Sequence, residues 1–202
     1  MCFNGAKSWW LGWYSETGKE GHEEVSPAVN GWEGKLVGID DYITNNAFDD
    51  SNHRVILKVK TESTSSAFPD LYVMFNRKKG VNAEVAGFGD TVTVVSQYKE
   101  AAAQSWLNAT LDATTDTFWN ANFDDSGSNL VVQVCEIVYG TPDYARVIVY
   151  LQGTNDLSCT TPSPTVSSAP SLSPTPMPSS FPSGSPTVQP RLSPTPSAKP
   201  TA

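Results

Sequence analysis

The segments NLVVQVCEIVY (129–139) and ARVIVYLQ (145–152) decide the fold class of this chain. Both are short runs in which valine and isoleucine predominate, and a turn-forming stretch with Gly140, Pro142 and Asp143 separates them. Branched and aromatic side chains favour the pleated geometry of a strand over a helix. The two segments therefore predict two β-strands.

Five further runs earlier in the chain have the same character and are likewise separated by Gly, Asn, Asp and Pro. Seven short strands with such turns are typical of an antiparallel sandwich. We expect a mainly β chain, with an antiparallel β-sandwich or jelly-roll-like domain over residues 25–159. In the first run, Leu36, Ile39, Tyr42 and Ile43 are expected in one buried layer. The five runs are GKLVGIDDYI (34–43), RVILKVK (54–60), DLYVMFNR (70–77), DTVTVVSQYK (90–99) and SWLNATLD (105–112).

Residues 3–13 predict a short helix. The side chain of Asn4 is a good N-terminal cap, and Gly12 suits the left-handed residue that follows a helix. A single short helix is marginal in water, so it must pack on the rest of the fold. Its expected apolar face consists of Ala6, Trp9, Trp10 and Trp13.

The composition changes at residue 160. Residues 160–202 contain 12 of the 15 prolines and 18 serines or threonines, and Phe181 is their one aromatic residue. Such a segment buries too little apolar surface to offset the entropy of ordering. We expect a disordered or extended tail, of the kind that forms spacers or O-glycosylated stalks.

The net charge argues against several kinds of partner. The chain carries 13 basic and 21 acidic residues, a net charge of −8. Arg191 and Lys199 are the only charged residues of the tail, so residues 1–159 carry 11 basic against 21 acidic residues, a net charge of −10. Nucleic acids and anionic membranes select basic surfaces. No stretch reaches the 18 or so apolar residues of a membrane span, so we expect no transmembrane segment.

Three cysteines allow at most one disulfide within the chain. Cys135 lies in a predicted strand and Cys159 ends the last ordered segment, so a bond between them would tie that end to the core. Two separate buried thiols are the alternative. Cys2 is left without a partner in either case.

The sequence does not indicate a catalytic or metal-binding residue. His22 and His53 lie 31 positions apart and lack the short ligand spacings of a zinc site. The carboxylates beside His22 in GKEGHEE (18–24) fit a solvated loop. The acidic loops AFDDSNH (47–53) and NFDDSGSN (122–129) offer oxygen ligands to Ca²⁺, but ordinary turn chemistry also explains them.

Two features point to sugars. Asn108-Ala109-Thr110 is an acceptor triplet for N-glycosylation in a secreted protein, although a polar strand residue facing solvent is the plain alternative. Trp32, Trp106 and Trp119 would stack on sugar rings if exposed. Packing in the core is the favoured interpretation of these three tryptophans.

The segment CFNGAKSWWLGWYS (2–15) resembles the closing helix of the catalytic domain in gametolysin-type zinc metallopeptidases, a branch of the metzincin group. Those proteins usually have Gln at the place of Trp10. The segments WEGKLVGIDDY (32–42) and VCEIVYGTPDYARVIVYLQ (134–152) resemble the β-rich region that follows that domain. The tail resembles the stalks of secreted algal wall proteins.

The resemblance implies where the chain begins and what it lacks. The two histidines and the glutamate of the family's zinc-binding helix, its third ligand and its Met-turn have no match here, and all would precede Met1. Residues 1–24 would then be the closing helix and linker left from the catalytic domain, and Cys2 would have lost its partner. Zinc belongs to the full-length family, and no cofactor is expected in this chain.

The expected function is therefore that of a C-terminal, non-catalytic portion of a secreted metallopeptidase that acts on cell walls or extracellular matrix. The chain alone is expected to be inactive. Its expected location is extracellular or in the cell wall, with a matrix glycoprotein or polysaccharide as partner. The alternatives are a free-standing extracellular binding or adhesion module and a structural wall protein with a Pro-rich stalk.

Overall fold

The computed structural model describes residues 4–16, 19–44, 48–49, 51–63, 68–100, 103–112 and 117–159. The chain divides into two units, Met1–Thr161 and Pro162–Ala202. All described residues belong to the first unit, and the expected tail (160–202) lies outside them. The expected boundary near residue 25 falls inside the first unit, because residues on both sides of it pair in one sheet.

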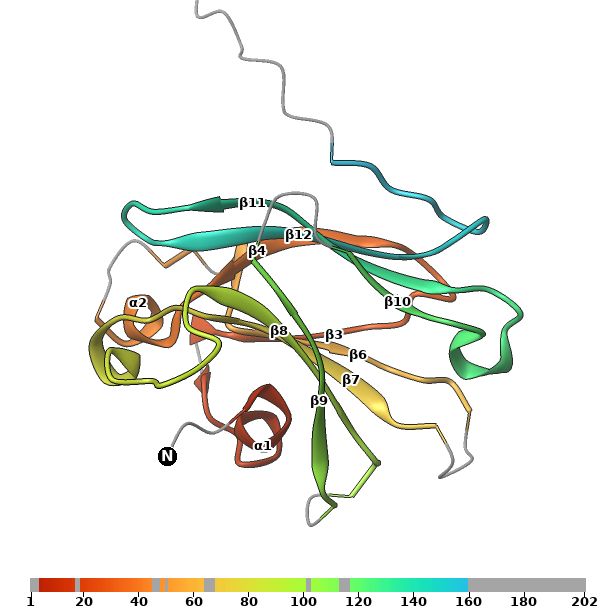
Figure 1. The fold of residues 1–202 in the computed structure, drawn as a ribbon, viewed down its shortest axis with the longest axis horizontal. Helices are drawn as coiled ribbons and strands as arrows, with labels where there is room; N and C mark the ends of the chain where they lie inside the picture. The colour runs from red at the N-terminus through yellow and green to blue at the C-terminus, as the bar shows by residue number, and fades with distance from the viewer. Residues whose placement is uncertain are drawn as a thin grey trace, which may run out of the picture. The chain divides into compact units, whose positions relative to one another are not determined.

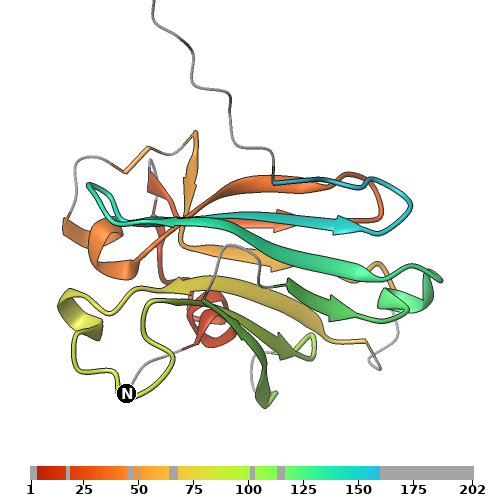
Figure 2. The same ribbon diagram turned by 45° about the horizontal axis from the view of Figure 1, so that its top comes forward.

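Within the described residues, two five-stranded sheets face each other, which confirms the expected mainly β sandwich (Figures 1 and 2). The strand order is β10-β11-β12-β4-β5 in one sheet and β3-β6-β7-β8-β9 in the other. Most neighbours are antiparallel, but the pairs β4–β5 and β3–β6 are parallel. The strands are β3 (His22–Val25), β4 (Trp32–Val37), β5 (His53–Arg54), β6 (Ile56–Val59), β7 (Asp70–Asn76), β8 (Thr91–Gln97), β9 (Ser105–Leu111), β10 (Thr117–Asn120), β11 (Leu130–Val138) and β12 (Tyr144–Leu151).

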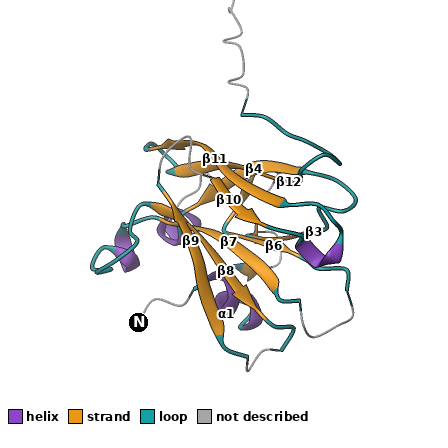
Figure 3. Ribbon diagram, turned by 45° about the vertical axis from the view of Figure 1, so that its right-hand side comes forward, coloured by secondary structure: helices purple, strands orange, loops and turns teal. Residues whose placement is uncertain are grey.

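Short elements complete the fold, and Figure 3 shows the helices in purple beside the orange strands. They are the helices α1 (Gly5–Trp10) and α2 (Ile39–Thr44), the paired strands β1 (Ser15–Glu16) and β2 (Lys19–Glu20), and the 3₁₀ turns η1 (Gly80–Asn82) and η2 (Phe123–Asp125). Among the described residues, no helix has the length and apolar character to cross a membrane.

The central strands of the second sheet are buried on both faces. In β7, Leu71, Val73 and Phe75 belong to the core between the sheets, whereas Tyr72 and Met74 belong to a second apolar cluster on the opposite face. Successive side chains of a strand point to opposite faces, so an uninterrupted apolar run such as LYVMF needs cover on both sides. Helices α1 and α2 contribute to that second cluster.

Helix α1 is capped at both ends, as the sequence predicts. The side chain of Asn4 accepts a hydrogen bond from the backbone N–H of Lys7 at 3.1 Å. At the other end Gly12 has a φ of +68°, and the N–H groups of Gly12 and Trp13 donate to the carbonyls of Trp9 and Ser8. This is the Schellman arrangement, for which glycine is preferred because it lacks a Cβ.

The face that α1 buries differs from the predicted one. Gly5, Ala6 and Ser8 are its buried residues, and Trp9 packs against the second apolar cluster. Trp10 and Trp13 are exposed, so the expected tryptophan-rich contact surface is only partly correct. The small side chains let the helix backbone lie close to β6 and β7, beside Tyr72 and Met74.

The predicted strand at 34–43 is wrong beyond Val37. The strand ends before Gly38, and residues Ile39–Thr44 form α2, with Asp40 and Asp41 in its first turn. Acidic residues are favourable there because they face the positive end of the helix dipole. Leu36, Ile39 and Tyr42 are buried and Ile43 is exposed. The expected single layer is wrong, because Leu36 lies in the core between the sheets whereas Ile39 and Tyr42 lie in the second apolar cluster.

The predicted disulfide joins Cys135 of β11 to Cys159, with 5.2 Å between the Cα atoms. Asn155 also holds this last segment, because its side chain donates to the carbonyl of Pro27 and accepts from the N–H of Leu151. Cys2 lies outside the described residues.

Candidate ligand-binding groove

An open groove of about 640 Å³ lies between β9 and β10. Each of these strands is the last in its sheet, and they approach each other at one side of the sandwich (Figures 1 and 3). The described residues that line the groove are Pro69, Leu71, Ser96, Leu107, Asn108, Phe118, Trp119, Asn120 and Ala121. Their side chains are apolar, aromatic, amide or hydroxyl, and none carries a charge.

A bulge in β9 places one of these residues. Val94 pairs with Ala109 and Val95 with Leu107, so Asn108 is an extra residue without an opposite partner in β8. Such bulges bend an edge strand and redirect a side chain. The Oγ of Ser96 donates to the Oδ1 of Asn108 at 3.3 Å, which links the bulge to the groove wall.

The three tryptophans considered for sugar stacking differ in exposure. Trp32 is 8% exposed and lies in the core between the sheets, so core packing is correct for this residue. Trp119 is 52% exposed and Trp106 is 41% exposed, so core packing is wrong for both. Trp119 lines the groove, and Trp106 packs edge-on against Tyr98 with 5.5 Å between the ring centroids.

The groove thus unites two features that the sequence analysis treated separately, the Asn108 triplet and Trp119. It also includes Ser96 and Asn120, which the sequence analysis missed. Neither residue carries a signal in the sequence. The exposure of Trp119 beside Asn120 depends on β10 lying at the edge of its sheet, and the role of Ser96 depends on the pairing of β8 with β9.

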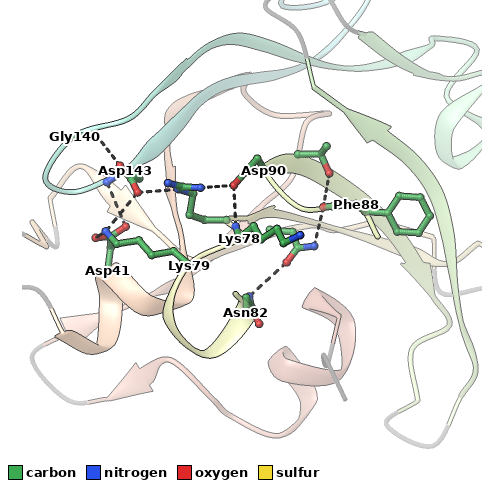
Figure 4. A network of polar contacts seen from close by, with 11 residues as sticks. Asp41, Lys78, Lys79, Asn82, Phe88, Asp90, Gly140 and Asp143 are labelled. Atoms are coloured by element: carbon green, nitrogen blue, oxygen red, sulfur yellow. Dashed lines mark hydrogen bonds and ion pairs between the residues drawn. The ribbon is translucent and has the colours of Figure 1, made fainter. Parts of the chain in front are cut away.

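A second polar constellation joins α2, the segment after β7 and the β11–β12 turn (Figure 4). Arg77 Nε donates to Asp143 Oδ2 at 2.8 Å, and the same guanidinium pairs with Asp90. Lys79 Nζ donates to Asp41 Oδ1 at 2.8 Å and lies 3.4 Å from Asp143. Asp41 and Asp143 are buried.

The charged side chains of this polar cluster are paired with one another. Burial opposes the ionisation of Asp143, but hydrogen bonds from Arg77 and from the N–H of Gly140, with the charges of Arg77 and Lys79, outweigh it and lower the pKa of Asp143. An acid that stays ionised and fully hydrogen-bonded is a poor proton donor or acceptor at neutral pH. We assign the cluster a structural role.

A smaller cavity of about 250 Å³ lies beside β4 and includes Glu23, Arg54, Glu33 and Arg146. Arg54 pairs with Glu23, and Arg146 lies between Glu33 and Glu136 at 2.8 and 3.0 Å. Both arginines of this cavity therefore form ion pairs within the fold.

The residues considered for metal binding have other contacts. His22 stacks on Trp9 with 4.4 Å between the ring centroids. The Nδ1 of His53 accepts from the N–H of Asp49. Asp124 accepts from the N–H groups of Glu62 and Ser63, which anchors that loop.

Over the described part of the chain, no three His, Cys, Asp or Glu side chains gather in a way that would hold a metal ion. Asp50 lies outside the described residues.

Comparison with known proteins adds no assignment. No protein-family model, no curated protein and no solved structure matches this chain.

Proposed function

We propose that this chain is a non-catalytic extracellular binding module, and that the groove between β9 and β10 takes an uncharged polysaccharide of a cell wall or matrix. The observation that carries the proposal is Trp119, a half-exposed tryptophan of the edge strand β10 that lines an open groove together with Asn108, Asn120 and Ser96.

The chemistry of the groove fits a sugar chain. The C–H face of a pyranose ring packs on an indole, which offers a large, rigid apolar surface. Amide and hydroxyl side chains provide the donors and acceptors that sugar hydroxyls need. The uncharged lining favours a neutral ligand, and the open shape suits a chain that extends beyond the groove at both ends.

The compartment in the proposal rests on the disulfide and on composition. Disulfides persist in oxidising environments outside the cytosol, and Cys135 and Cys159 are bonded here. The Pro-, Ser- and Thr-rich residues 160–202 suit a spacer in a wall or matrix.

Affinity electrophoresis of the full chain, produced without N-linked glycan, through gels that contain single wall polysaccharides tests the binding. We expect retardation in at least one neutral polysaccharide, and we expect Trp119→Ala to abolish it. Trp13→Ala is the matched control, because Trp13 is an exposed tryptophan on the α1 side and does not line the groove. Equal retardation of both variants, or none with any neutral polysaccharide, contradicts the proposal.

On the resemblance of residues 2–15, 32–42 and 134–152, we further propose that the module descends from the C-terminal part of a gametolysin-type zinc metallopeptidase. Such peptidases need metal ligands and a general base beside the metal-bound water, and the sequence has no match to the family's set. We expect no turnover of gelatin or casein by the purified chain with added zinc. Turnover that a chelator abolishes would refute the non-catalytic assignment.

A further inference from the structure

The acceptor triplet Asn108-Ala109-Thr110 lies in β9, an edge strand. Asn108 is exposed and sits at the bulge, where it has no opposite partner in β8. Its amide oxygen accepts from Ser96. The atom that N-glycosylation modifies is the other end of the amide, Nδ2, so that hydrogen bond is compatible with an attached sugar.

An aromatic ring stands beside this asparagine. Trp106 precedes Asn108 by two positions and pairs directly with Ser96 across β8 and β9. Since Asn108 bonds to the side chain of that same serine, Trp106 and Asn108 lie on the same side of the sheet edge. Trp106 is 41% exposed while Tyr98 packs against it edge-on.

We propose that Asn108 carries an N-linked glycan whose first sugar packs on Trp106, and that this glycan covers the edge of β9 and the mouth of the groove. The significance of a covered groove rests on the proposed function. The donor is a lipid-diphosphate-linked oligosaccharide. The amide nitrogen forms a bond to the anomeric carbon, the bond from that carbon to the diphosphate oxygen breaks, and the amide proton passes to a base of the transferase.

The glycan would have two effects on this surface. An edge strand presents unpaired backbone groups that invite association with another chain, and natural proteins cover or charge such edges. In β9, Trp106, Leu107 and Asn108 are all exposed and uncharged. A hydrophilic sugar chain on Asn108, the last residue of this run, would shield it. Because Asn108 also lines the groove, the same sugar chain would compete with an external polysaccharide.

Occupancy is tested with the full chain directed into the secretory pathway of eukaryotic cells. Its intact mass before and after peptide N-glycosidase treatment is compared for the wild type, Thr110→Ala and Thr110→Ser. We expect a glycan-sized loss of mass for the wild type and for Thr110→Ser, which keeps the acceptor triplet, and none for Thr110→Ala. A secreted wild-type chain without glycan at Asn108 overturns the proposal.

The contact with Trp106 is tested in the secreted protein by a double-mutant cycle of Trp106→Ala and Thr110→Ala. Thr110→Ala removes the glycan and keeps Asn108, whereas peptide N-glycosidase would leave Asp at that position. Loss of the glycan should make the ratio of folded to unfolded protein about two- to tenfold smaller when Trp106 is present, as for aromatic packing contacts. It should change nothing in the Trp106→Ala background. Equal effects of Thr110→Ala in both backgrounds show that the sugar does not pack on Trp106 and overturn that part.

Binding separates this inference from the proposed function. In affinity electrophoresis, the glycosylated wild type should show loss of retardation relative to Thr110→Ala and to the deglycosylated wild type. Retardation that is identical in all three overturns the masking role. If none of the three binds, both the masking role and the polysaccharide proposal fail, while occupancy and the Trp106 cycle still decide the glycan itself.

Discussion

At the scale of single residues, Asp143 is a buried acid with several polar partners. It accepts hydrogen bonds from Arg77 and Gly140, and its backbone N–H donates to Asp41. We predict that Asp143→Asn destabilises the protein by about 2 kcal/mol, because hydrogen bonds to charged groups are stronger than neutral ones. Urea unfolding followed by tryptophan fluorescence measures this change.

Glu33→Gln provides the control for that prediction. Glu33 pairs with Arg146 at 2.8 Å, but its side chain is half exposed and Arg146 retains Glu136. Exposed pairs contribute little, so the change should stay within about 0.5 kcal/mol. A larger loss for Glu33→Gln than for Asp143→Asn would contradict the role assigned to the buried cluster.

At the scale of residues, the sequence predicted least well which aromatic side chains are exposed. Trp106 lies in a predicted strand run and Trp32 lies beside one, whereas Trp119 lies in none, because β10 was not predicted. General packing preference favours burial for all three. Only the position of the strand in its sheet distinguishes them, since β4 is interior whereas β9 and β10 are edges. Which strand becomes an edge depends on pairings between residues far apart in the chain.

At the scale of elements, the docking of α1 depends on a small residue. A Cβ at Gly5 would lie 3.5 Å from the Cβ atoms of Met74 and Tyr72, which is ordinary contact distance. We predict that Gly5→Ala stabilises the protein by about 0.5 kcal/mol, by restricting the unfolded chain. Gly5→Leu should destabilise it by about 2 kcal/mol through overpacking. Thermal unfolding measures the stability of both variants. Equal changes in stability for Gly5→Ala and Gly5→Leu would contradict this docking.

The contact between α1 and β3 should make stability depend on pH. Burial lowers the pKa of His22 below its ordinary 6.5, against the opposing effect of a backbone hydrogen bond at Trp13. The Nε2 of His22 is buried with no hydrogen-bond partner among the described residues. The unfolded chain therefore takes up a proton at a higher pH than the folded one, and the stabilisation is complete above about pH 6.5 and declines below it.

The matched variant for that pH dependence is His22→Phe, which keeps an aromatic ring against Trp9 and cannot titrate. The wild type should lose stability in urea between about pH 7 and pH 5, and the variant should lose less. The remaining loss is expected from His53, whose pKa is also lowered, first by burial and then by Lys35. Identical pH profiles for both proteins would exclude His22 as a contributor.

Element-scale prediction succeeded for long, uniform runs and failed at their ends. The runs at 129–139 and 145–152 became β11 and β12, which pair along nearly their whole lengths. The run at 34–43 ended early, because Gly38 breaks it and Asp40 and Asp41 suit a helix start. The parallel edges β3 and β5 are too short to give a period-two signal, and their pairing is set by the strands beside them.

At the scale of the whole molecule, the disulfide fixes the end of the first unit. Cys135 and Cys159 close a loop with a sequence separation of 24. We predict that Cys159→Ser lowers the free energy of unfolding by about 3 kcal/mol, mainly by freeing the unfolded chain. Reduction of the wild type should give the same loss, measured by urea unfolding, and an unchanged midpoint on reduction would contradict it.

The sequence predicted the architecture better than the sites. Periodicity and turn residues suffice for a sandwich, because each strand carries its own signal. The same signals do not predict the polar cluster, because its residues lie far apart in the sequence. They come together only when α2, the segment after β7 and the β11–β12 turn meet, and they are Asp41, Arg77, Lys79 and Asp143. The groove likewise exists only once β9 and β10 lie side by side.

The central claim is that the groove between β9 and β10 binds a neutral sugar chain. The most direct test is an NMR titration of the unglycosylated full chain with neutral oligosaccharides, observed at the indole N–H groups of its 6 tryptophans. The account predicts saturable shifts of the Trp119 signal, with Trp13 and Trp32 unchanged. Saturation without any movement of Trp119, or shifts confined to the tryptophans of α1, would contradict it.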